Sequence, residues 1–344
     1  MKRIFSAILA ALTMVTMFSG CSQTSEEPER SEIFVMSTYV SQQVYGEQKA
    51  EAVKKVNELL VSLEKELSLY IEGSDIDRIN KNAGIAPVEV SDYTYELVKK
   101  AKEYSELSEG RFDITIAPVT LLWAIDSDHP TVPEQAQLDE ALKLVDYRKI
   151  QLDDEKKSVY LETKGMALDL GGVAKGYIAG RIWEEYQKYA IKTALVSIGG
   201  NICAYGLKPD GKPFKLGIRD PLSTVSTDII GKLTVTDRIV ATTGAYERYF
   251  EKDGKRYHHV LDPKTGYPVD SDLLSVTVIC PDGGLADYLS TTLFIGGKAL
   301  VSEYMNDSRF DLIVIDKDKK VTVSKEIQDQ FELTAEGYEL ENLS

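Results

Sequence analysis

The sequence has a shortage of positive charge. Its 40 Lys and Arg stand against 55 Asp and Glu, so the formal net charge of the 344-residue chain is −15. This charge repels a phosphate backbone and argues against nucleic acid as the partner. The remaining composition, with 43% hydrophobic, 28% charged and 9% aromatic residues, excludes collagen-like, disordered and polytopic membrane proteins. The length suggests about two domains, or one domain with two lobes.

The N-terminal apolar run is too short to span a membrane comfortably. It extends from Ile4 to Phe18 behind two basic residues and is closely followed by Cys21, whereas a spanning helix needs about 20 apolar residues. The layout is that of a secretory signal and resembles a bacterial lipoprotein signal, with a plain signal anchor as the alternative. The resemblance implies removal of residues 1–20 and lipidation of Cys21. The polar residues 21–32 would tether a domain of residues 33–344 to the extracytoplasmic face of the cell membrane.

Cysteine is also scarce, and the two cysteines beyond Cys21 have no metal-type spacing. Cys203 and Cys280 lie 77 positions apart in apolar, strand-like runs. In an extracytoplasmic compartment they could pair. Their apolar surroundings favour two buried, unpaired thiols.

The chain lacks internal repeats and lacks the regular strand–helix alternation of a doubly wound sheet. Apolar residues at helical spacing predict a helix over 47–67, and Ser74 and Ser91 predict the starts of two more, ending near Gly84 and at Gly110. Strands are expected at 36–44, 193–198, 214–218, 233–240 and 274–279, a hairpin over 151–169, helices over 171–189 and 286–294, and two strands over 311–323. The order is mixed α+β, with a weak internal boundary at 126–133.

The segment Asp169–Gly176 has the features of an anion site. Its two adjacent glycines let a ligand approach the backbone, amides at a helix start favour an anion, and Lys175 adds positive charge. It is neither a Walker loop nor a dinucleotide-fold fingerprint, because no Ser or Thr follows Lys175 and the GxGxxG spacing is absent. A tight turn with a solvent-facing lysine is the structural alternative.

Two of the three histidines precede a turn-forming run. His258 and His259 are followed by Val260, Leu261 and the sequence Asp-Pro-Lys-Thr-Gly over 262–266, in which proline fixes φ and glycine takes a positive φ. If the segment is a strand, adjacent side chains point to opposite faces, so at most one histidine faces a given pocket. A surface or structural role is the alternative for each.

A carboxylate and a hydroxyl are spaced to share one helix face near the C-terminal third. Asp287 and Thr291 are four residues apart, so on a helix they would offer two oxygen ligands to one hard cation. The alternative is a helix N-terminus at which the aspartate balances the dipole.

Together and in this order, these clusters resemble the FAD:protein FMN transferase (ApbE) family. The resemblance covers nearly all of residues 33–344 and includes five further motifs, at 36–38, 68–70 together with 74–80, 110–115, 197–201 and 241–244. One such motif is weak, but eight in order are highly specific. The resemblance implies an α+β, mixed, two-lobed (T-fold-like) architecture with FAD bound in the central cleft. Ser37 stands where glycine is more usual in the family.

The resemblance also implies the site residues. Contacts to FAD would come from Met36, Tyr70, Arg111, Phe112, Asp113, Asp169, Lys175 and Leu261. Ligands of Mg²⁺ would be the Gly172 carbonyl, Asp287 and Thr291, with Ser290 adjacent. His259 and Asp287 are the expected catalytic residues, with His259 as the first candidate for the base and a carboxylate such as Asp262 as an alternative.

The implied reaction transfers FMN from FAD to a Thr or Ser hydroxyl of a partner protein and releases AMP. A Mg²⁺-dependent FAD pyrophosphatase, in which water replaces the protein hydroxyl, is the alternative within enzymes, and a non-catalytic FAD-binding lipoprotein is the alternative outside them. The resemblance implies flavin-acceptor subunits of membrane redox complexes as partners.

Overall fold

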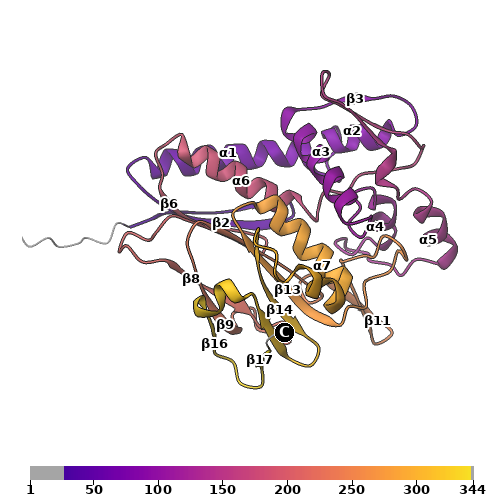
Figure 1. Cartoon of the computed structure of the whole chain (residues 1–344). Coiled ribbons are helices and arrows are strands. Elements are labelled where there is room, and N and C mark those ends of the chain that lie inside the picture. The colour runs from indigo at the N-terminus through magenta and orange to yellow at the C-terminus, as the bar shows by residue number, and fades with distance from the viewer. Residues whose placement is uncertain (1–26, 342–344) are drawn as a thin grey trace, which may run out of the picture.

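A nine-stranded sheet forms the centre of the protein. The computed structural model describes residues 27–341, and Figure 1 shows the sheet with helices gathered along one side. In spatial order the strands are β1 (Glu29–Val35), β2 (Thr38–Tyr45), β6 (Thr193–Ile198), β7 (Asn201–Tyr205), β10 (Arg238–Gly244), β13 (Leu273–Cys280), β14 (Asp311–Asp316), β15 (Lys320–Val323) and β17 (Glu339–Glu341). Neighbouring strands are antiparallel except for β15 and β17.

Two hydrophobic cores lie on opposite faces of this sheet because side chains alternate along each strand. Helices α1 (Lys49–Leu67), α6 (Ala174–Gln187) and α7 (Gly283–Tyr304) cover one face and contain the larger core. The other face packs against β8 (Phe214–Arg219), β9 (Ile229–Val235), β16 (Phe331–Leu333) and the 3₁₀ helix η2 (Lys325–Gln330).

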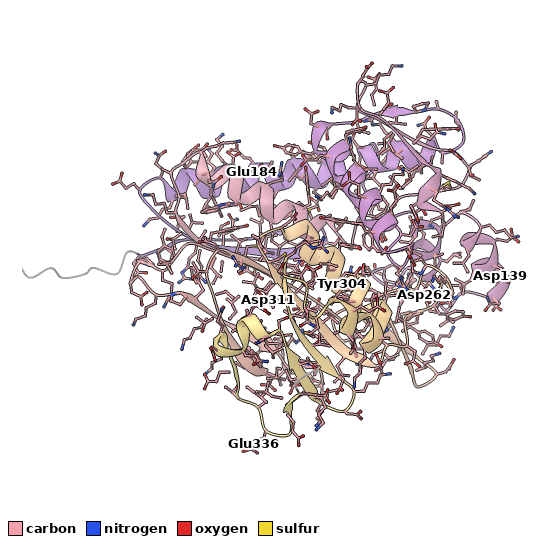
Figure 2. The ribbon with its side chains drawn as sticks, in the orientation of Figure 1. Asp139, Glu184, Asp262, Tyr304, Asp311 and Glu336 are labelled. Atoms are coloured by element: carbon pink, nitrogen blue, oxygen red, sulfur yellow. The ribbon has the colours of Figure 1, made fainter. Side chains whose placement is uncertain are left out.

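The remaining elements form a helix-rich part at the end of the sheet where Asp262 and Asp139 lie (Figures 1 and 2). They are α2 (Asp75–Lys81), α3 (Asp92–Leu107), α4 (Ala117–Trp123), α5 (Gln135–Leu142), the 3₁₀ helix η1 (Tyr147–Lys149), the small sheet of β3 (Val88–Glu89), β4 (Ile150–Asp153) and β5 (Ser158–Leu161), and the hairpin of β11 (Tyr249–Lys252) and β12 (Lys255–His258). A third core joins α4 and α5 to Leu261. Trp123 Nε1 donates to the Gly266 carbonyl at 2.7 Å, which fixes the turn after the paired histidines.

The predicted α+β class is confirmed, and most element predictions are close. Ser74 and Ser91 cap α2 and α3 by accepting from Asp77 N and Thr94 N. One predicted strand starts too early and another is wrong. The strand expected over 36–44 begins at Thr38, because Met36 and Ser37 form a hairpin turn with φ of 57° each. Residues 233–240 span the break between β9 and β10, where Asp237 has φ of 51°.

The two described cysteines are buried and unpaired, as the apolar surroundings indicated. Cys203 in β7 and Cys280 in β13 are both paired with Ile239 of the intervening strand β10. They are therefore separated by two strand spacings, about 9.6 Å. A disulfide needs Cα atoms within about 7 Å, so the sheet itself keeps these thiols apart, and burial raises the pKa of each to about 12.

The predicted anchor region lies mostly outside the described residues, including Cys21. The predicted tether reaches Glu32, whereas β1 begins at Glu29 and pairs with β2 along its whole length. Across residues 27–341 no helix is long and apolar enough to cross a membrane.

Candidate active site

The site is built where α6 crosses the beginning of α7. Gly176 and Gly283 face each other so closely that a Cβ on Gly176 would lie 1.9 Å from the Gly283 carbonyl oxygen. This contact brings the α6 backbone to Asp287, whose Oδ2 accepts from Gly176 N at 3.0 Å. Gly176 thus serves the packing of the two helices, whereas the phosphate approach expected from the sequence concerns Gly171 and Gly172.

Replacing Gly176 with alanine is expected to destabilise the fold by about 3 kcal/mol or more, because overpacking forces the two helices apart. Gly180, one turn further along α6, is the matched control, since a Cβ there meets no atom within 4 Å. Gly180→Ala should be neutral or stabilising by up to about 1 kcal/mol. Chemical denaturation of the two variants measures both values, and equal stabilities would contradict the close crossing.

Asp287 is a buried carboxylate held by three donors. Besides Gly176 N, Asn201 Nδ2 donates to its Oδ1 at 3.0 Å, and Lys175 Nζ lies 3.5 Å from the same oxygen. Lys175 Nζ also donates to the Gly171 carbonyl at 3.3 Å. The predicted residues Lys175 and Asp287 are therefore brought together, although they are 112 positions apart in the sequence.

Three hydroxyl groups lie beside Asp287. Ser290 and Thr291 donate to the Asp287 backbone carbonyl at 2.9 and 3.2 Å. Thr243 Oγ1, from β10, lies 2.8 Å from Ser290 Oγ and 3.3 Å from Thr291 Oγ1. Ser290 is fully buried, whereas Thr291 is partly exposed.

This donor set fits a hard divalent cation. A carboxylate, a threonine hydroxyl and a backbone carbonyl are oxygen ligands of the kind that Mg²⁺ takes while keeping water and substrate phosphates. The Lys175 ammonium lies near both the Asp287 carboxylate and the Gly171 carbonyl, so these oxygens already face one positive charge. Among residues 27–341 no group of three or more His, Cys, Asp or Glu could hold a metal. A cation held here would therefore have few protein ligands, with Asp287 as its carboxylate.

His258 and His259 have different surroundings, because β12 ends at His258 and His259 lies in the bend that follows it. His258 turns inward, packs edge-on against Phe294 and bonds through Nε2 to the Val269 carbonyl at 2.9 Å. His259 Nδ1 lies 3.2 Å from the Arg248 carbonyl oxygen. A carbonyl only accepts, so this contact places the proton on Nδ1 and leaves the Nε2 lone pair free, the state required of a base.

Positive charge and burial keep His259 neutral. Burial lowers the pKa of His259 well below its ordinary value, and the charges of Arg248 and Lys175 lower it further. The same two cations act on Glu247, whose pKa is raised by burial. His259, Lys175 and Glu247 thus share one electrostatic environment with Asp287.

The predicted flavin residues fall into two groups. Asp169 and Phe112 lie next to the Gly171–Gly172 segment: Asp169 Oδ1 accepts from Gly171 N at 2.8 Å, and a Cβ on Gly172 would lie 2.9 Å from the Phe112 ring. The Tyr70 side chain is 64% exposed, but partial desolvation of its hydroxyl, followed by the charge of the nearby Asp169 carboxylate, raises its pKa to about 12, which places Tyr70 beside this group.

The other predicted flavin residues have local partners. Asp113 accepts from Thr115 N, Thr115 Oγ1 and Tyr147 N, which holds the start of the loop to α4. Met36 N donates to Glu64 at 2.6 Å, and Arg111 donates to the Ser108 carbonyl at 3.3 Å. Leu261 is buried in the third core. Flavin contact at these positions stays a prediction.

Three polar residues of the site had no predicted role. Asn201, Thr243 and Glu247 all lie in or beside motifs quoted from the sequence, but their positions beside Asp287, Ser290 and Lys175 depend on strands β7 and β10 meeting α7. The sequence offered one signal for them, which is that each is a polar residue inside or next to a motif of the resemblance.

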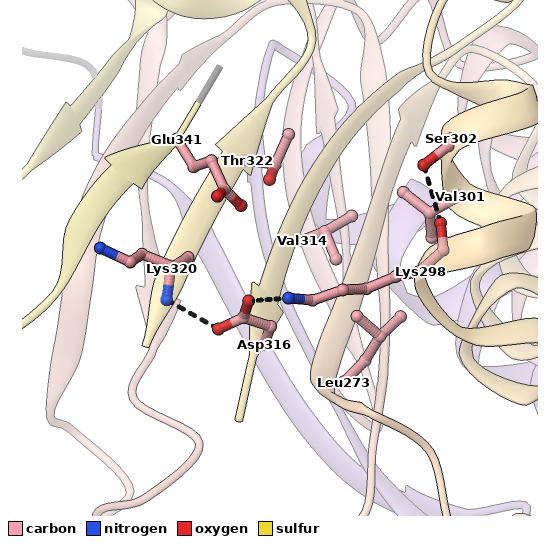
Figure 3. A pocket seen from close by; sticks show the side chains of 9 residues that line it. All are labelled: Leu273, Lys298, Val301, Ser302, Val314, Asp316, Lys320, Thr322 and Glu341. Carbon is pink, nitrogen blue, oxygen red and sulfur yellow. Dashed lines mark hydrogen bonds and ion pairs between the residues drawn. The ribbon is translucent and has the colours of Figure 1, made fainter. Parts of the chain in front are cut away.

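Two surface pockets lie elsewhere. One is formed at the far end of α7 from Asp287, where Lys298 forms an ion pair with Asp316 beneath Thr322 and Glu341 (Figure 3). The other is lined by the β12 side of the hairpin, including Tyr257 and His258. Neither is lined by a predicted flavin or metal residue.

The fold and this donor set define an α+β protein with a lysine–aspartate–histidine site suited to a phosphate ester and a cation. The ApbE family model matches residues 36–314, and the chain belongs to this family. It is 34% identical to the FAD:protein FMN transferase of Klebsiella pneumoniae over 89% of this chain and 95% of that protein, and 35% identical to that of Treponema pallidum over 92% and 91%.

Solved structures agree with the family assignment. The crystal structure of the ApbE protein from Thermotoga maritima superposes with a TM-score of 0.82 at 31% identity, covering 88% of this chain and 99% of that one. The flavin transferase ApbE from Vibrio cholerae has a TM-score of 0.76 at 24% identity, covering 91% and 98%, and shares the fold.

Proposed function

We propose that this protein transfers the FMN moiety of FAD to a threonine or serine hydroxyl of an acceptor protein and releases AMP. The relatives named above carry this activity in their names. The observation that carries the proposal is the convergence of Lys175 and Asp287 beside a neutral, oriented His259. These groups match the two needs of the reaction, which are charge neutralisation at a pyrophosphate and removal of a hydroxyl proton.

The bond changes follow from this arrangement. The acceptor oxygen attacks the FMN-side phosphorus, and the bond from that phosphorus to the bridging oxygen breaks, so AMP leaves with the bridging oxygen. His259 Nε2 accepts the hydroxyl proton while the Arg248 carbonyl holds the opposite ring nitrogen. Lys175 binds the pyrophosphate as a positive point charge.

We propose Mg²⁺ as the cation, with Asp287, Thr291 and the Gly172 carbonyl as its protein ligands and Ser290 supporting them. Bound there, Mg²⁺ supplies further neutralisation of the pyrophosphate charge. The role of Asp287 in this arrangement is to hold the cation next to Lys175, which explains a buried carboxylate with a lysine 3.5 Å away.

The pH dependence of transfer tests the state of His259. The active base is the neutral imidazole, which is lost only when the pH falls below its lowered pKa. The acid limb of the rate profile is therefore expected below pH 6.5, the ordinary histidine value. Arg248→Gln removes one of the charges that lower this pKa and should move the limb to higher pH. If the acid limb stays at the same pH in Arg248→Gln, the titration of His259 does not cause that limb.

We further propose that Cys21 is lipidated and that the enzyme works at the extracytoplasmic face of the cell membrane on flavin-acceptor subunits of membrane redox complexes. The support is the signal layout over 1–21. Mass measurement of the N-terminal peptide after expression in a bacterium tests the anchor. A diacylated Cys21 is expected, and Cys21→Ser should release the protein from the membrane fraction.

A further inference from the structure

We propose that Asn201 and Thr243 are positioning residues on the sheet side of the cation site. Asn201 holds the ligand Asp287, whereas Thr243 engages Ser290 and so leaves the neighbouring Thr291 hydroxyl available as a ligand. This inference rests on the proposed function, since it deepens the assignment of the same site. Both residues come from neighbouring strands: Asn201 begins β7 and Thr243 lies near the end of β10, and the two strands pair directly. Helix α7 packs against β10, so side chains from the sheet face that α7 covers can contact the ligands on this helix.

Asn201 fixes the orientation of the Asp287 carboxylate. Its side chain is 1% exposed, and its Nδ2 donates to Asp287 Oδ1 at 3.0 Å, while Gly176 N donates to Oδ2. One donor on each oxygen prevents rotation of the carboxylate plane. A carboxylate oxygen has two lone-pair sites, so a further site on Oδ1 is left for Lys175 or a cation.

Thr243 decides which hydroxyl on α7 can act as a ligand. Ser290 and Thr291 both use their hydroxyl hydrogens on the Asp287 carbonyl. Thr243 has one hydroxyl hydrogen to give, and its nearer partner is Ser290 Oγ at 2.8 Å, against 3.3 Å for Thr291 Oγ1. Ser290 Oγ therefore uses one of its two lone pairs on Thr243 and is fully buried, whereas the partly exposed Thr291 Oγ1 keeps both lone pairs for a cation.

Direct Mn²⁺ binding, followed by electron paramagnetic resonance with and without FAD, tests this inference without relying on catalysis. Asn201→Ala and Thr243→Val are each expected to raise the Mn²⁺ dissociation constant about 10–100-fold, the usual cost of removing a group that supports a metal ligand. Thr243→Ser keeps the hydroxyl and should bind Mn²⁺ like the native protein. Thr243→Val is nearly isosteric, so it remains informative if Asn201→Ala folds poorly.

Thr242→Val is the matched control. Thr242 precedes Thr243 in β10, so its side chain points to the opposite face of the sheet, away from α7. Its hydroxyl lies 2.9 Å from Thr277 Oγ1 in the neighbouring strand β13. This variant also loses a hydroxyl contact, but Mn²⁺ binding should be unchanged. In transfer assays, saturating Mg²⁺ should restore the rate of Asn201→Ala and Thr243→Val, which a general folding defect would not allow.

The outcomes separate this inference from the function on which it rests. Native affinity for Mn²⁺ in both Asn201→Ala and Thr243→Val would overturn the positioning role while leaving the transferase proposal intact. Equal losses in Thr243→Val and Thr242→Val would also overturn it. If the native protein does not bind Mn²⁺, either with or without FAD, the proposed cation site does not exist and both proposals fail at that point.

Discussion

Replacing Asp287 with asparagine is expected to lower the rate of FMN transfer about 10²–10³-fold, the usual effect of removing a group that stabilises transition-state charge. The variant keeps an oxygen to accept from Gly176 N but loses the negative charge that faces Lys175 and would bind the cation. Cation binding and cation-dependent FAD binding should weaken together. Isothermal titration with Mg²⁺, with and without FAD, and a transfer assay measure the three effects.

The control for this variant is Asp139→Asn, which removes a carboxylate from the exposed face of α5 (Figure 2). It should transfer flavin at the native rate. Metal-dependent transfer at the native rate in Asp287→Asn would show that the cation is held elsewhere, and transfer that needs no metal would contradict the cation site.

Replacing His259 with alanine is expected to lower transfer about 10²–10⁴-fold, the range of general-base assistance, while FAD still binds. The physical reason is the loss of the Nε2 lone pair that the Arg248 carbonyl orients through Nδ1. Single-turnover rates with bound FAD separate the chemical step from binding.

His129 provides the control because it is exposed in the loop before α5. His129→Ala should behave like the native protein. A native rate in His259→Ala would transfer the role of base to a carboxylate, of which Glu247 is favoured by its raised pKa and its proximity to Lys175.

Local features of the fold could be predicted from the sequence, because they depend on neighbouring residues. The apolar spacing of α1 and the caps at Ser74 and Ser91 are of this kind. The Met36–Ser37 turn escaped prediction because both residues adopt positive φ without glycine, a conformation that costs about 1 kcal/mol or more per residue and is imposed by strand pairing.

The site, too, has features that local sequence predicts and features that only the fold creates. The spacing of Asp287 and Thr291 predicted a shared helix face, and both now lie beside Lys175 or Thr243. The contact from Asn201 to Asp287 spans 86 positions and that from Thr243 to Ser290 spans 47. No local pattern encodes such contacts, because they arise only when β7 and β10 pair beneath α7.

Mass spectrometry of a flavin-acceptor domain tests the central claim most directly. The domain is incubated with this protein, FAD and Mg²⁺, and a parallel sample contains EDTA. The account predicts that the acceptor gains the mass of FMN while AMP is released, and that EDTA abolishes both. Release of AMP and free FMN without any modified acceptor, across several acceptors, would contradict transfer and indicate a hydrolase, whereas bound FAD with no AMP would indicate a flavin carrier.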